Sequence, residues 1–360
     1  MQTLQVKSKD GDYAVVIGEG AWRALGRLDR GRYSSIFVLT EAALWKRWCA
    51  PFLKESGLGR ATALFVAPGE SSKSLPVLSA LAERLLKLGA DRRTLLVLFG
   101  GGVIGDLGGF LAAVYMRGID YVNVPTTVLA QVDSSIGGKT AVNLGAMKNL
   151  LGAFYPPRLV LSEPRVLSSL SSRDFRSGLY EAVKHAVIQG PRLFSQLEKN
   201  ADTLSPGNFG VLARLLPRIA KVKVAVVNED EREACRRAVL NLGHTFGHAL
   251  EEATGYTRFV HGEAVAWGII AVARLAVRLA RLEASEAGRI ERLVWRLGPL
   301  PAIRDLSTAA VVRLLPQDKK AVAGKIHWVL PEKIGAVRVT TEVPIAAIRA
   351  AFEDVRRMSA

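Results

Sequence analysis

The first half of the chain alternates short apolar runs with longer amphipathic stretches, and this alternation limits the folds open to it. Five runs have the length and the β-branched and aromatic content of buried strands, namely Tyr13–Ile17 and residues 35–40, 62–67, 94–99 and 121–124. Helices are predicted at residues 41–56, 75–89 and 107–115. Strands that alternate with helices form mostly parallel sheets covered on both faces. The first half is therefore predicted to be an α/β domain.

The pattern changes from about Leu167 onward, where long amphipathic stretches replace the short apolar runs. Helices are predicted at residues 179–188, 209–227, 237–254, 262–282 and 287–297, and a late pair of short strands at 325–331 and 334–339. A chain of 360 residues has room for about two domains. We expect an α/β domain over residues 1–165 and a mainly α-helical domain over residues 166–360, although residues 159–161 fit the sheet as well.

The composition is that of a globular protein, since 49% of the residues are hydrophobic and 23% are charged. The first residues lack the basic segment and apolar run of a secretory signal, and no run of about 18 apolar residues occurs. The two cysteines, Cys49 and Cys235, form no Cys-x-x-Cys pair, which argues against a disulfide framework or a thiolate zinc site. A soluble protein of the cytoplasm is expected.

The formal net charge of +16 raises the question of an anionic partner. The basic residues are dispersed, with no run of five or more, and many lie at helical spacing from glutamates, as in residues 274–293. Nucleic-acid binding needs a basic stripe or patch, so neither nucleic acid nor a membrane is expected as a partner. An anionic small-molecule substrate accounts for only a few of these charges.

Gly100, Gly102 and Gly105 form a Gly-x-Gly-x-x-Gly motif directly after a predicted strand and before a helix. Such a turn exposes backbone N–H groups and a helix N-terminus, which can hold a pyrophosphate. Two features weaken the usual dinucleotide interpretation: the motif lies far from the first strand, and Asp120 precedes a strand instead of following one. A plain strand-to-helix turn is therefore the alternative.

A second polar turn supports the nucleotide hypothesis. Pro68-Gly69-Glu70 and Lys73 follow another predicted strand, at the same edge of the predicted sheet. Ligands of open α/β sheets bind at the carboxyl ends of the strands. The two turns together predict a Rossmann-like N-terminal domain with a dinucleotide crevice.

Three of the five histidines, His244, His248 and His261, lie within 18 residues of one another. His244 and His248 are four residues apart on a predicted helix and therefore share one face. Because Thr and Phe follow His244, the His-Glu-x-x-His motif of metalloproteases is absent. Histidines grouped beside glycines in a histidine-poor chain favour a metal site, and separate structural histidines are the alternative.

A carboxylate is the expected partner of these histidines. Glu181 and Lys184 lie three residues apart on an otherwise apolar predicted helix, where an unpaired buried charge is costly. A surface Glu–Lys pair is the alternative for this segment taken alone. Two histidines and one glutamate with an open position suit catalytic zinc, but the spacing does not decide which two histidines bind.

Residues 125–149 carry Asp133, Lys139, Lys148 and Asn149 among glycines and small hydroxyl residues. This composition suits a loop that closes around a polyhydroxylated anion, with lysine as the phosphate-binding charge.

Lys223, Arg237 and Asn241 lead into the histidine segment. Arg237 and Asn241 are four residues apart and His244 follows one turn later, which predicts a polar stripe that ends at His248. A solvated helix face is the alternative interpretation. The charged turn Asp318-Lys319-Lys320 indicates little by itself.

Several blocks of the sequence resemble one enzyme family. GGGVIGDLGGFLAAVYMRG, VPTTVLAQVDSSIGGKTAVN, KNLLGAFYPP, NLGHTFGHALE and HGEAVAWG are similar to the 3-dehydroquinate synthase family, within the sugar-phosphate cyclase superfamily. A later DKK, followed by a Gly and VLP, belongs to the same resemblance, which follows family order and spans roughly residues 68–331. One departure is at Thr40-Glu41, where family members commonly carry Asp or Asn for the adenosine ribose.

The resemblance implies a divalent metal, zinc with cobalt as the alternative, held by Glu181, His244 and His261. His248 would then face the substrate as a polar or proton-relay residue. The other catalytic residues implied by the resemblance are Asp133, Lys139, Lys184 and Asn241.

The resemblance also implies the contacts of substrate and cofactor. The phosphate would lie among Lys139, Asn149, Asn241 and a lysine of the Asp-Lys-Lys turn, for which Lys320 is chosen, and Lys148 is assigned to both substrate and NAD. Arg117 resembles a residue that completes the phosphate site across a homodimer interface. Lys223 and Arg237 would hold the substrate carboxylate. The implied NAD contacts are Glu70, Lys73, Gly101, Gly102, Asp106, Thr126 and Thr127, with Lys139 and Lys148.

The family's reaction converts 3-deoxy-D-arabino-heptulosonate 7-phosphate, a phosphorylated sugar acid, into 3-dehydroquinate and phosphate in the shikimate pathway. A ring hydroxyl is transiently oxidised by NAD, phosphate is eliminated, the ketone is reduced again, and the ring opens and closes by an aldol step. The alternatives are a sister cyclase acting on another phosphorylated sugar, a metal-dependent alcohol dehydrogenase of related fold, and a non-catalytic nucleotide-binding protein. The pair Lys223 and Arg237 favours a substrate with a carboxylate.

Overall fold

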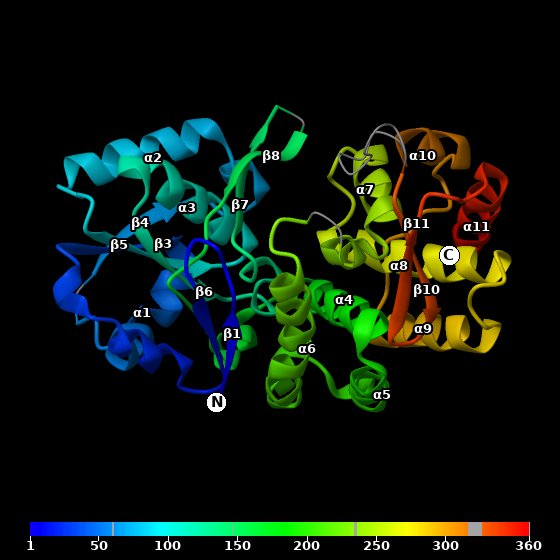
Figure 1. The fold of residues 1–360 in the computed structure, drawn as a ribbon, viewed down its shortest axis with the longest axis horizontal. Helices are drawn as coiled ribbons and strands as arrows, with labels where there is room; N and C mark the ends of the chain where they lie inside the picture. The colour runs from blue at the N-terminus through cyan, green and yellow to red at the C-terminus, as the bar shows by residue number, and fades with distance from the viewer. Residues whose placement is uncertain (60, 146, 234–235, 316–325, 360) are drawn as a thin grey trace. The chain divides into compact units, whose positions relative to one another are not determined.

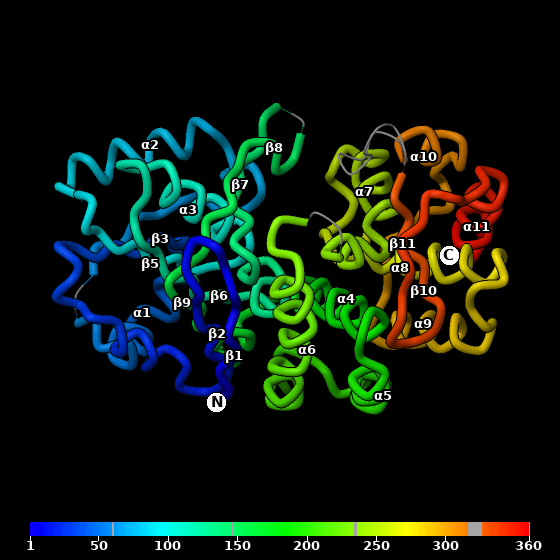
Figure 2. The backbone as a smooth tube through the Cα atoms, in the orientation of Figure 1, coloured from blue at the N-terminus to red at the C-terminus, as the bar shows by residue number. Residues whose placement is uncertain are grey.

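A computed structural model describes residues 1–59, 61–145, 147–233, 236–315 and 326–359 (Figures 1 and 2). The chain forms two compact units. The first unit comprises Met1–Leu170 and Leu212–Arg232, and the second comprises Ser171–Val211 and Glu233–Ala360. The division into domains at residue 165 stays a prediction.

The first unit is built on a seven-stranded sheet with the order β1-β2-β9-β6-β5-β3-β4. The strands are β1 (Gln2–Val6), β2 (Tyr13–Ile17), β3 (Ser35–Glu41), β4 (Thr62–Val66), β5 (Thr94–Gly100), β6 (Asp120–Pro125) and β9 (Leu159–Ser162). Only β1 pairs in the antiparallel sense, with β2, while the other neighbouring strands of this sheet are parallel. The predicted mostly parallel sheet is therefore confirmed, and β9 belongs to it.

Alternate residues of the central strands face different helices, as the two-residue period of a strand requires. Leu96 and Leu98 of β5 lie in a core cluster with residues of α2 (Leu75–Lys87) and α3 (Gly102–Val114). Phe99 contacts Phe52 of α1 (Ala42–Ser56), with ring centroids 4.9 Å apart. Figure 1 shows α2 and α3 on one side of the strands and α1 on the other. The sheet is thus covered on both faces, as the apolar strand sequences require.

Helix α3 begins at Gly102, directly after the glycine turn, and not at residue 107 as predicted. Glycine has a poor helix propensity, by about 1 kcal/mol relative to alanine, which obscured the first turns in the sequence. Close packing explains why glycine is present. A Cβ atom on Gly108 would lie 2.3 Å from a Leu98 methyl group, and one on Gly109 would lie 2.4 Å from Thr140.

The segment expected to form an anion-binding loop is more ordered than predicted. After β6, a short π-helical turn spans Ala130–Ser134, and an antiparallel hairpin follows, made of β7 (Lys139–Leu144) and β8 (Met147–Phe154). In the sequence, glycines and small polar residues interrupt the alternation of apolar and polar side chains that usually indicates a strand. Asn143 of β7 also forms a parallel bridge with Ser74, which joins the hairpin to the second polar turn.

The second unit is mainly helical, as predicted. Its helices are α4 (Ser172–Gln189), α5 (Pro191–Asn200), α7 (His244–Ala253), α8 (His261–Arg278), α9 (Ala284–Leu297), α10 (Thr308–Leu314) and α11 (Ile345–Met358). α6 (Phe209–Glu229) begins in this unit and continues into the first. A two-stranded sheet of β10 (Trp328–Lys333) and β11 (Ala336–Thr340) completes the second unit. Helix α8 is buried along nearly its whole length, which makes it the centre of the unit.

The single helix predicted at residues 237–254 is wrong. A 3-10 helix, η9 (Arg236–Asn241), is separated from α7 by Gly243, whose φ of +79° breaks the helical path. Arg237 and Asn241 therefore do not continue one helical stripe to His244 and His248.

Short 3-10 helices connect the larger elements, at Ala21–Arg27, Arg30–Arg32, Glu70–Ser72, Tyr115–Arg117, Pro164–Ser169, Ala201–Thr203 and Pro206–Asn208. Among the described residues, no helix has both the length and the apolar content needed to cross a membrane.

Candidate active site

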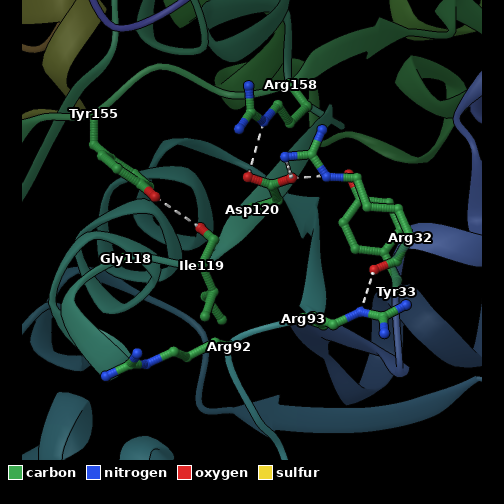
Figure 3. Close-up of a pocket in the computed structure, with 9 residues that line it drawn as sticks. All are labelled: Arg32, Tyr33, Arg92, Arg93, Gly118, Ile119, Asp120, Tyr155 and Arg158. Carbon is green, nitrogen blue, oxygen red and sulfur yellow. Dashed lines mark hydrogen bonds and ion pairs between the residues drawn. The ribbon is translucent and has the colours of Figure 1, made fainter.

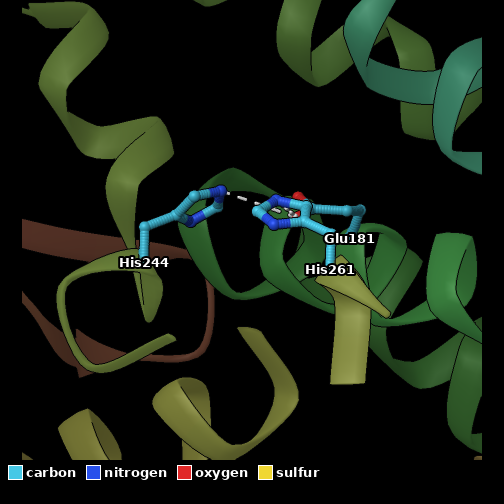
Figure 4. Close-up of side chains that lie close together, drawn as sticks. All are labelled: Glu181, His244 and His261. Atoms are coloured by element: carbon cyan, nitrogen blue, oxygen red, sulfur yellow. Dashed lines mark ion pairs between the residues drawn. The ribbon is translucent and has the colours of Figure 1, made fainter. Parts of the chain in front are cut away.

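Glu181, His244 and His261 converge in the second unit (Figure 4). Their ligand atoms all lie within 4.8 Å of one another, and Oε1 of Glu181 is 3.6 Å from Nε2 of each histidine. Glu181 is fully buried. A buried carboxylate that faces two imidazole nitrogens is a donor set that fits zinc or a similar divalent ion and leaves a coordination position open.

Two glycines explain how three elements bring these side chains together. A Cβ atom on Gly262 would lie 2.0 Å from the carbonyl oxygen of Ser177, so only glycine allows the start of α8 to approach α4 this closely. A Cβ atom on Gly268 of α8 would lie 1.8 Å from the carbonyl oxygen of Gly243. Gly262 follows His261 and Gly243 precedes His244. The close contacts therefore occur next to the histidines that face Glu181.

Each histidine of this cluster has an oxygen near its other ring nitrogen. Nδ1 of His244 lies 3.2 Å from the carbonyl oxygen of Leu242, and Nδ1 of His261 lies 3.4 Å from Oε2 of Glu251. A hydrogen on Nδ1 in both rings leaves the lone pair of Nε2 available to a metal ion placed between the rings and Glu181. Glu251 was not identified from the sequence, although it lies three residues after His248 on the same helical face.

Lys184 and His248 surround the cluster. Lys184 is buried and forms an ion pair with Oε2 of Glu181, which leaves Oε1 toward the histidines. The His248 ring lies edge-on to His244, with centroids 5.5 Å apart, and 6.2 Å from the ring of His261. His248 is absent from the group of converging ligand atoms.

Burial by itself lowers the pKa of His261, but the hydrogen bond and charge of Glu251 and the charge of Glu181 outweigh it, so the pKa is raised. The carboxylates thus favour a positive partner at this position, either a proton or a metal ion.

The glycine turn, to which nucleotide binding was assigned, lies in the first unit between the end of β5 and the start of α3. The N–H of Thr126 donates to the carbonyl oxygen of Gly100 at 2.9 Å, and a Cβ atom on Gly101 would lie 3.0 Å from Thr127. These contacts place Thr126 and Thr127 beside the turn. Gly102 begins α3, whose first N–H groups have no partner within the helix.

The polar turn at residues 68–73 is joined to the helix that follows the glycine turn by an ion pair. Nζ of Lys73 lies 2.6 Å from Oδ2 of Asp106 on α3 and 3.7 Å from Oε1 of Glu70. Burial alone would lower the pKa of Lys73, but the charges of Asp106 and Glu70 outweigh it and raise the pKa. Glu70 also accepts a hydrogen bond of 2.9 Å from the side chain of Asn143, which the sequence had not singled out.

The residues expected to bind substrate in the first unit form two sets. Asp133 and Lys223 form an ion pair, which joins the turn at Ala130–Ser134 to α6. Lys139 and Lys148 lie on the hairpin. Asn149, also on β8, has a φ of +53°, and its N–H donates to the side-chain oxygen of Asn143 at 2.8 Å.

The remaining predicted contacts are spread over both units. Arg117 is exposed in the first unit, with a left-handed φ of +67°. Arg237 is buried on η9 of the second unit, where the side chain of Asn241 donates to Glu233 at 3.2 Å. Lys320, with the whole Asp-Lys-Lys turn, lies outside the described residues. Thr40 and Glu41 end β3, and Thr40 is fully buried.

A cavity of about 430 Å³ in the first unit contains none of the predicted site residues (Figure 3). It lies at the amino ends of β5 and β6, and four arginines with Asp120 line it together with Tyr33 and Tyr155. Asp120 binds Arg158 at 2.8 Å and accepts a hydrogen bond of 3.0 Å from Tyr33. Asp120 therefore lies at the wrong end of its strand for a ribose contact beside the glycine turn.

Comparisons with known proteins point to one family. Residues 63–177 match the model of the 3-dehydroquinate synthase N-terminal region, and residues 178–321 match that of the C-terminal region. The chain is 41% identical to the 3-dehydroquinate synthase of Koribacter versatilis, over 100% of this chain and 99% of the relative. It is 44% identical to the 3-dehydroquinate synthase of Pelotomaculum thermopropionicum, over 93% of this chain and 92% of the relative.

Solved structures share the fold. A 2-deoxy-scyllo-inosose synthase complexed with carbaglucose-6-phosphate, NAD+ and Co2+ superposes with a TM-score of 0.84 and 27% identity, covering 99% of each chain. The 2-epi-5-epi-valiolone synthase of Streptomyces hygroscopicus, with NAD+ and Zn2+ bound, gives a TM-score of 0.86 and 25% identity over 98% of this chain and 99% of that one.

The fold and the cluster together define a class: proteins that join a Rossmann-like α/β unit to a mainly helical unit in which two histidines and a carboxylate converge. Within that class, the family models and the full-length relatives decide the family. The chain belongs to the 3-dehydroquinate synthase family.

Proposed function

We propose that this chain converts 3-deoxy-D-arabino-heptulosonate 7-phosphate into 3-dehydroquinate and phosphate. The observation that carries the proposal is the convergence of Glu181, His244 and His261 in a chain that belongs to the 3-dehydroquinate synthase family. We assign the metal site to these three residues, with zinc or cobalt as the ion, and NAD to the glycine turn of the first unit.

When bound, NAD takes up and returns one hydride, and the divalent ion polarises the hydroxyl that is oxidised. The chain's own residues hold these groups in place. Gly101 and Gly102 leave room for a pyrophosphate at the N-terminus of α3. The ion pair between Lys73 and Asp106 stiffens the adjoining turn, and Glu70, Thr126 and Thr127 complete the proposed NAD contacts.

Lys184 and His248 are the proposed proton-handling residues beside the metal ligands. Lys184 is held by Glu181, so its ammonium has a defined position for binding an oxygen of the substrate. His248 lies against His244, and an imidazole can both accept and donate a proton, which suits it to a relay role. Asp133, Lys139 and Lys184 are proposed to contact the substrate hydroxyls and the oxygen beside the metal. Asn241 is proposed to contact the phosphate.

The substrate's two anionic groups are assigned to cationic side chains. Lys139, Lys148 and Asn149 on the hairpin, with Lys320, are proposed to bind the phosphate, and Lys148 also to contact NAD. Lys223 and Arg237 are proposed to bind the carboxylate, where the planar guanidinium of Arg237 allows a bidentate contact. We also propose that the protein works as a cytoplasmic homodimer, in which Arg117 contributes to the phosphate site of the partner.

Phosphate release tests the proposal. The purified chain, supplied with NAD and zinc, should release phosphate from 3-deoxy-D-arabino-heptulosonate 7-phosphate, and a chelator should stop the release until zinc or cobalt is added back. Sedoheptulose 7-phosphate, which lacks the carboxylate, is the matched control substrate. Release from the control alone would assign the chain to a sister cyclase activity.

A further inference from the structure

The carboxylate of Glu251 lies behind one of the proposed metal ligands. Glu251 is on α7 and is only 3% exposed. Its Oε2 is 3.4 Å from Nδ1 of His261, the first residue of α8. The opposite nitrogen of that ring, Nε2, is 3.6 Å from Glu181. The His261 ring therefore lies between two buried carboxylates that come from two other helices.

His261 and His244 differ in the kind of oxygen that lies near the Nδ1 atom of each ring. The acceptor near Nδ1 of His244 is the carbonyl oxygen of Leu242, which belongs to the backbone two residues away. For His261 the acceptor is a side chain on a different helix. A backbone carbonyl survives any substitution, whereas the acceptor of His261 depends on the residue at position 251. The acceptor that faces Nδ1 of His261 is thus set by one side chain, that of Glu251.

We propose that Glu251 is a positioning residue for the metal site: it accepts a hydrogen bond from Nδ1–H of His261 and so directs Nε2 of that ring toward the metal. This inference rests on the proposed function, because it takes His261 as a metal ligand. An acceptor behind a ligating imidazole fixes its tautomer and raises its basicity, and removing such an acceptor typically lowers metal affinity by about 10- to 100-fold.

The helix offers a matched control. Glu252 is the next residue on α7, has the same side chain and is exposed. Glu251→Gln and Glu252→Gln remove the same charge from neighbouring positions, but only the first changes the group that faces His261. Glu251→Gln also keeps the size of the buried side chain, so the loss of packing volume is small.

The experiment measures Co2+ affinity of the full chain without substrate or NAD, by competition with a chelator of known affinity. Glu251→Gln should bind Co2+ about 10- to 100-fold more weakly than the unsubstituted chain. Glu252→Gln should stay within about twofold. The visible absorption of bound Co2+ should change in band position for Glu251→Gln, since the angle of one ligand changes. An unchanged affinity and spectrum in Glu251→Gln would overturn the inference.

Thermal unfolding of the metal-free proteins separates positioning from general stability. For a positioning role, metal-free Glu251→Gln should unfold at about the same temperature as the unsubstituted chain while its metal affinity falls. A lower unfolding temperature with unchanged affinity would show a purely structural role and contradict the inference. If the unsubstituted chain bound no Co2+, the metal site of the proposed function would be contradicted. If the unsubstituted chain and Glu251→Gln bound Co2+ equally well, only the role of Glu251 would be contradicted.

Discussion

Glu181 and Lys184 lie one helical turn apart on α4, and neither side chain reaches solvent. In the sequence this pair could equally have been a surface ion pair, because spacing carries no information about burial. In the structure the pair is buried beside two histidines, where an uncompensated charge costs several kcal/mol. The burial of Lys184 makes its removal a test of the site.

Lys184→Ala should lower turnover by at least about 100-fold, since the ammonium proposed to bind the substrate is lost and Glu181 loses its ion-pair partner. Initial rates of phosphate release measure the effect, and circular dichroism checks that the chain is folded. Lys199→Ala, an exposed lysine on α5, is the control and should keep full activity. Full activity in Lys184→Ala would remove this residue from the site.

Tyr33 provides a prediction about pH. Burial, with the charge and hydrogen bond of Asp120, raises the pKa of Tyr33 to about 12. The neutral phenol is favoured in the folded chain, so its contribution to stability is complete below the unfolded pKa of about 10 and is lost as the pH rises toward 12.

Asp120→Asn should therefore lower the pKa of Tyr33 part of the way toward its ordinary value, because the charge at position 120 disappears while Tyr33 stays buried. Absorbance at 295 nm, followed from pH 9 to pH 13, should show tyrosine ionisation at lower pH in Asp120→Asn, from Tyr33 and from Tyr155, whose pKa the charge of Asp120 also raises. The same substitution in a chain that also carries Tyr33→Phe should shift the titration less, because only the contribution of Tyr155 is left. An identical titration of Asp120→Asn and the unsubstituted chain would contradict the assignment.

At the scale of elements, glycines decide where helices meet. The sequence predicted that histidines beside glycines form a site, but it did not show that Gly262 touches the backbone of α4 or that Gly268 touches Gly243. Those contacts depend on the path of three helices. The same cause explains the wrong helix at 237–254: amphipathic spacing continued across Gly243, while the backbone turned there.

Gly262→Ala should destabilise the second unit by about 1–3 kcal/mol, since a Cβ atom there would lie 2.0 Å from a carbonyl oxygen and α8 must move. The shift should also weaken metal binding, because His261 is the preceding residue. Urea unfolding and Co2+ competition measure the two effects. Gly210→Ala, a helical position with nothing within 4 Å of the added atom, should leave both unchanged or slightly raise stability.

At the scale of the whole molecule, the formal net charge is +16, and a number of the arginines that contribute to it are held in ion pairs. Several arginines of the second unit pair with acids far away in the sequence. Arg274 of α8 binds Glu291 of α9 at 2.7 Å, and Arg289 binds Glu198 at 2.7 Å. Such surface pairs contribute little each, about 0–1 kcal/mol, so they explain solvated helix faces and not the stability of the fold.

Metal and NAD should protect different units of the chain. A ligand at about 100 times its Kd stabilises the folded state that binds it by about 2.7 kcal/mol. Zinc should therefore slow amide hydrogen exchange in α4, α7 and the start of α8, whereas NAD should slow it around the glycine turn and residues 70–73. Mass spectrometry of peptides measures both. Protection by zinc that is confined to the first unit would contradict the proposed ligands.

The sequence by itself determined the class of the fold, and with the family resemblance it supplied most of the residues proposed for the site. Strand and helix periods depend on neighbouring residues, so the parallel sheet, the helical second half and the glycine turn followed from local patterns, while the family and the ligand set followed from the resemblance. Only the tertiary structure decided that Lys184 is buried, that Asn143 bridges Glu70 and Asn149, and that Glu251 faces His261. These relations join residues on separate elements, and no local pattern encodes the approach of two backbones.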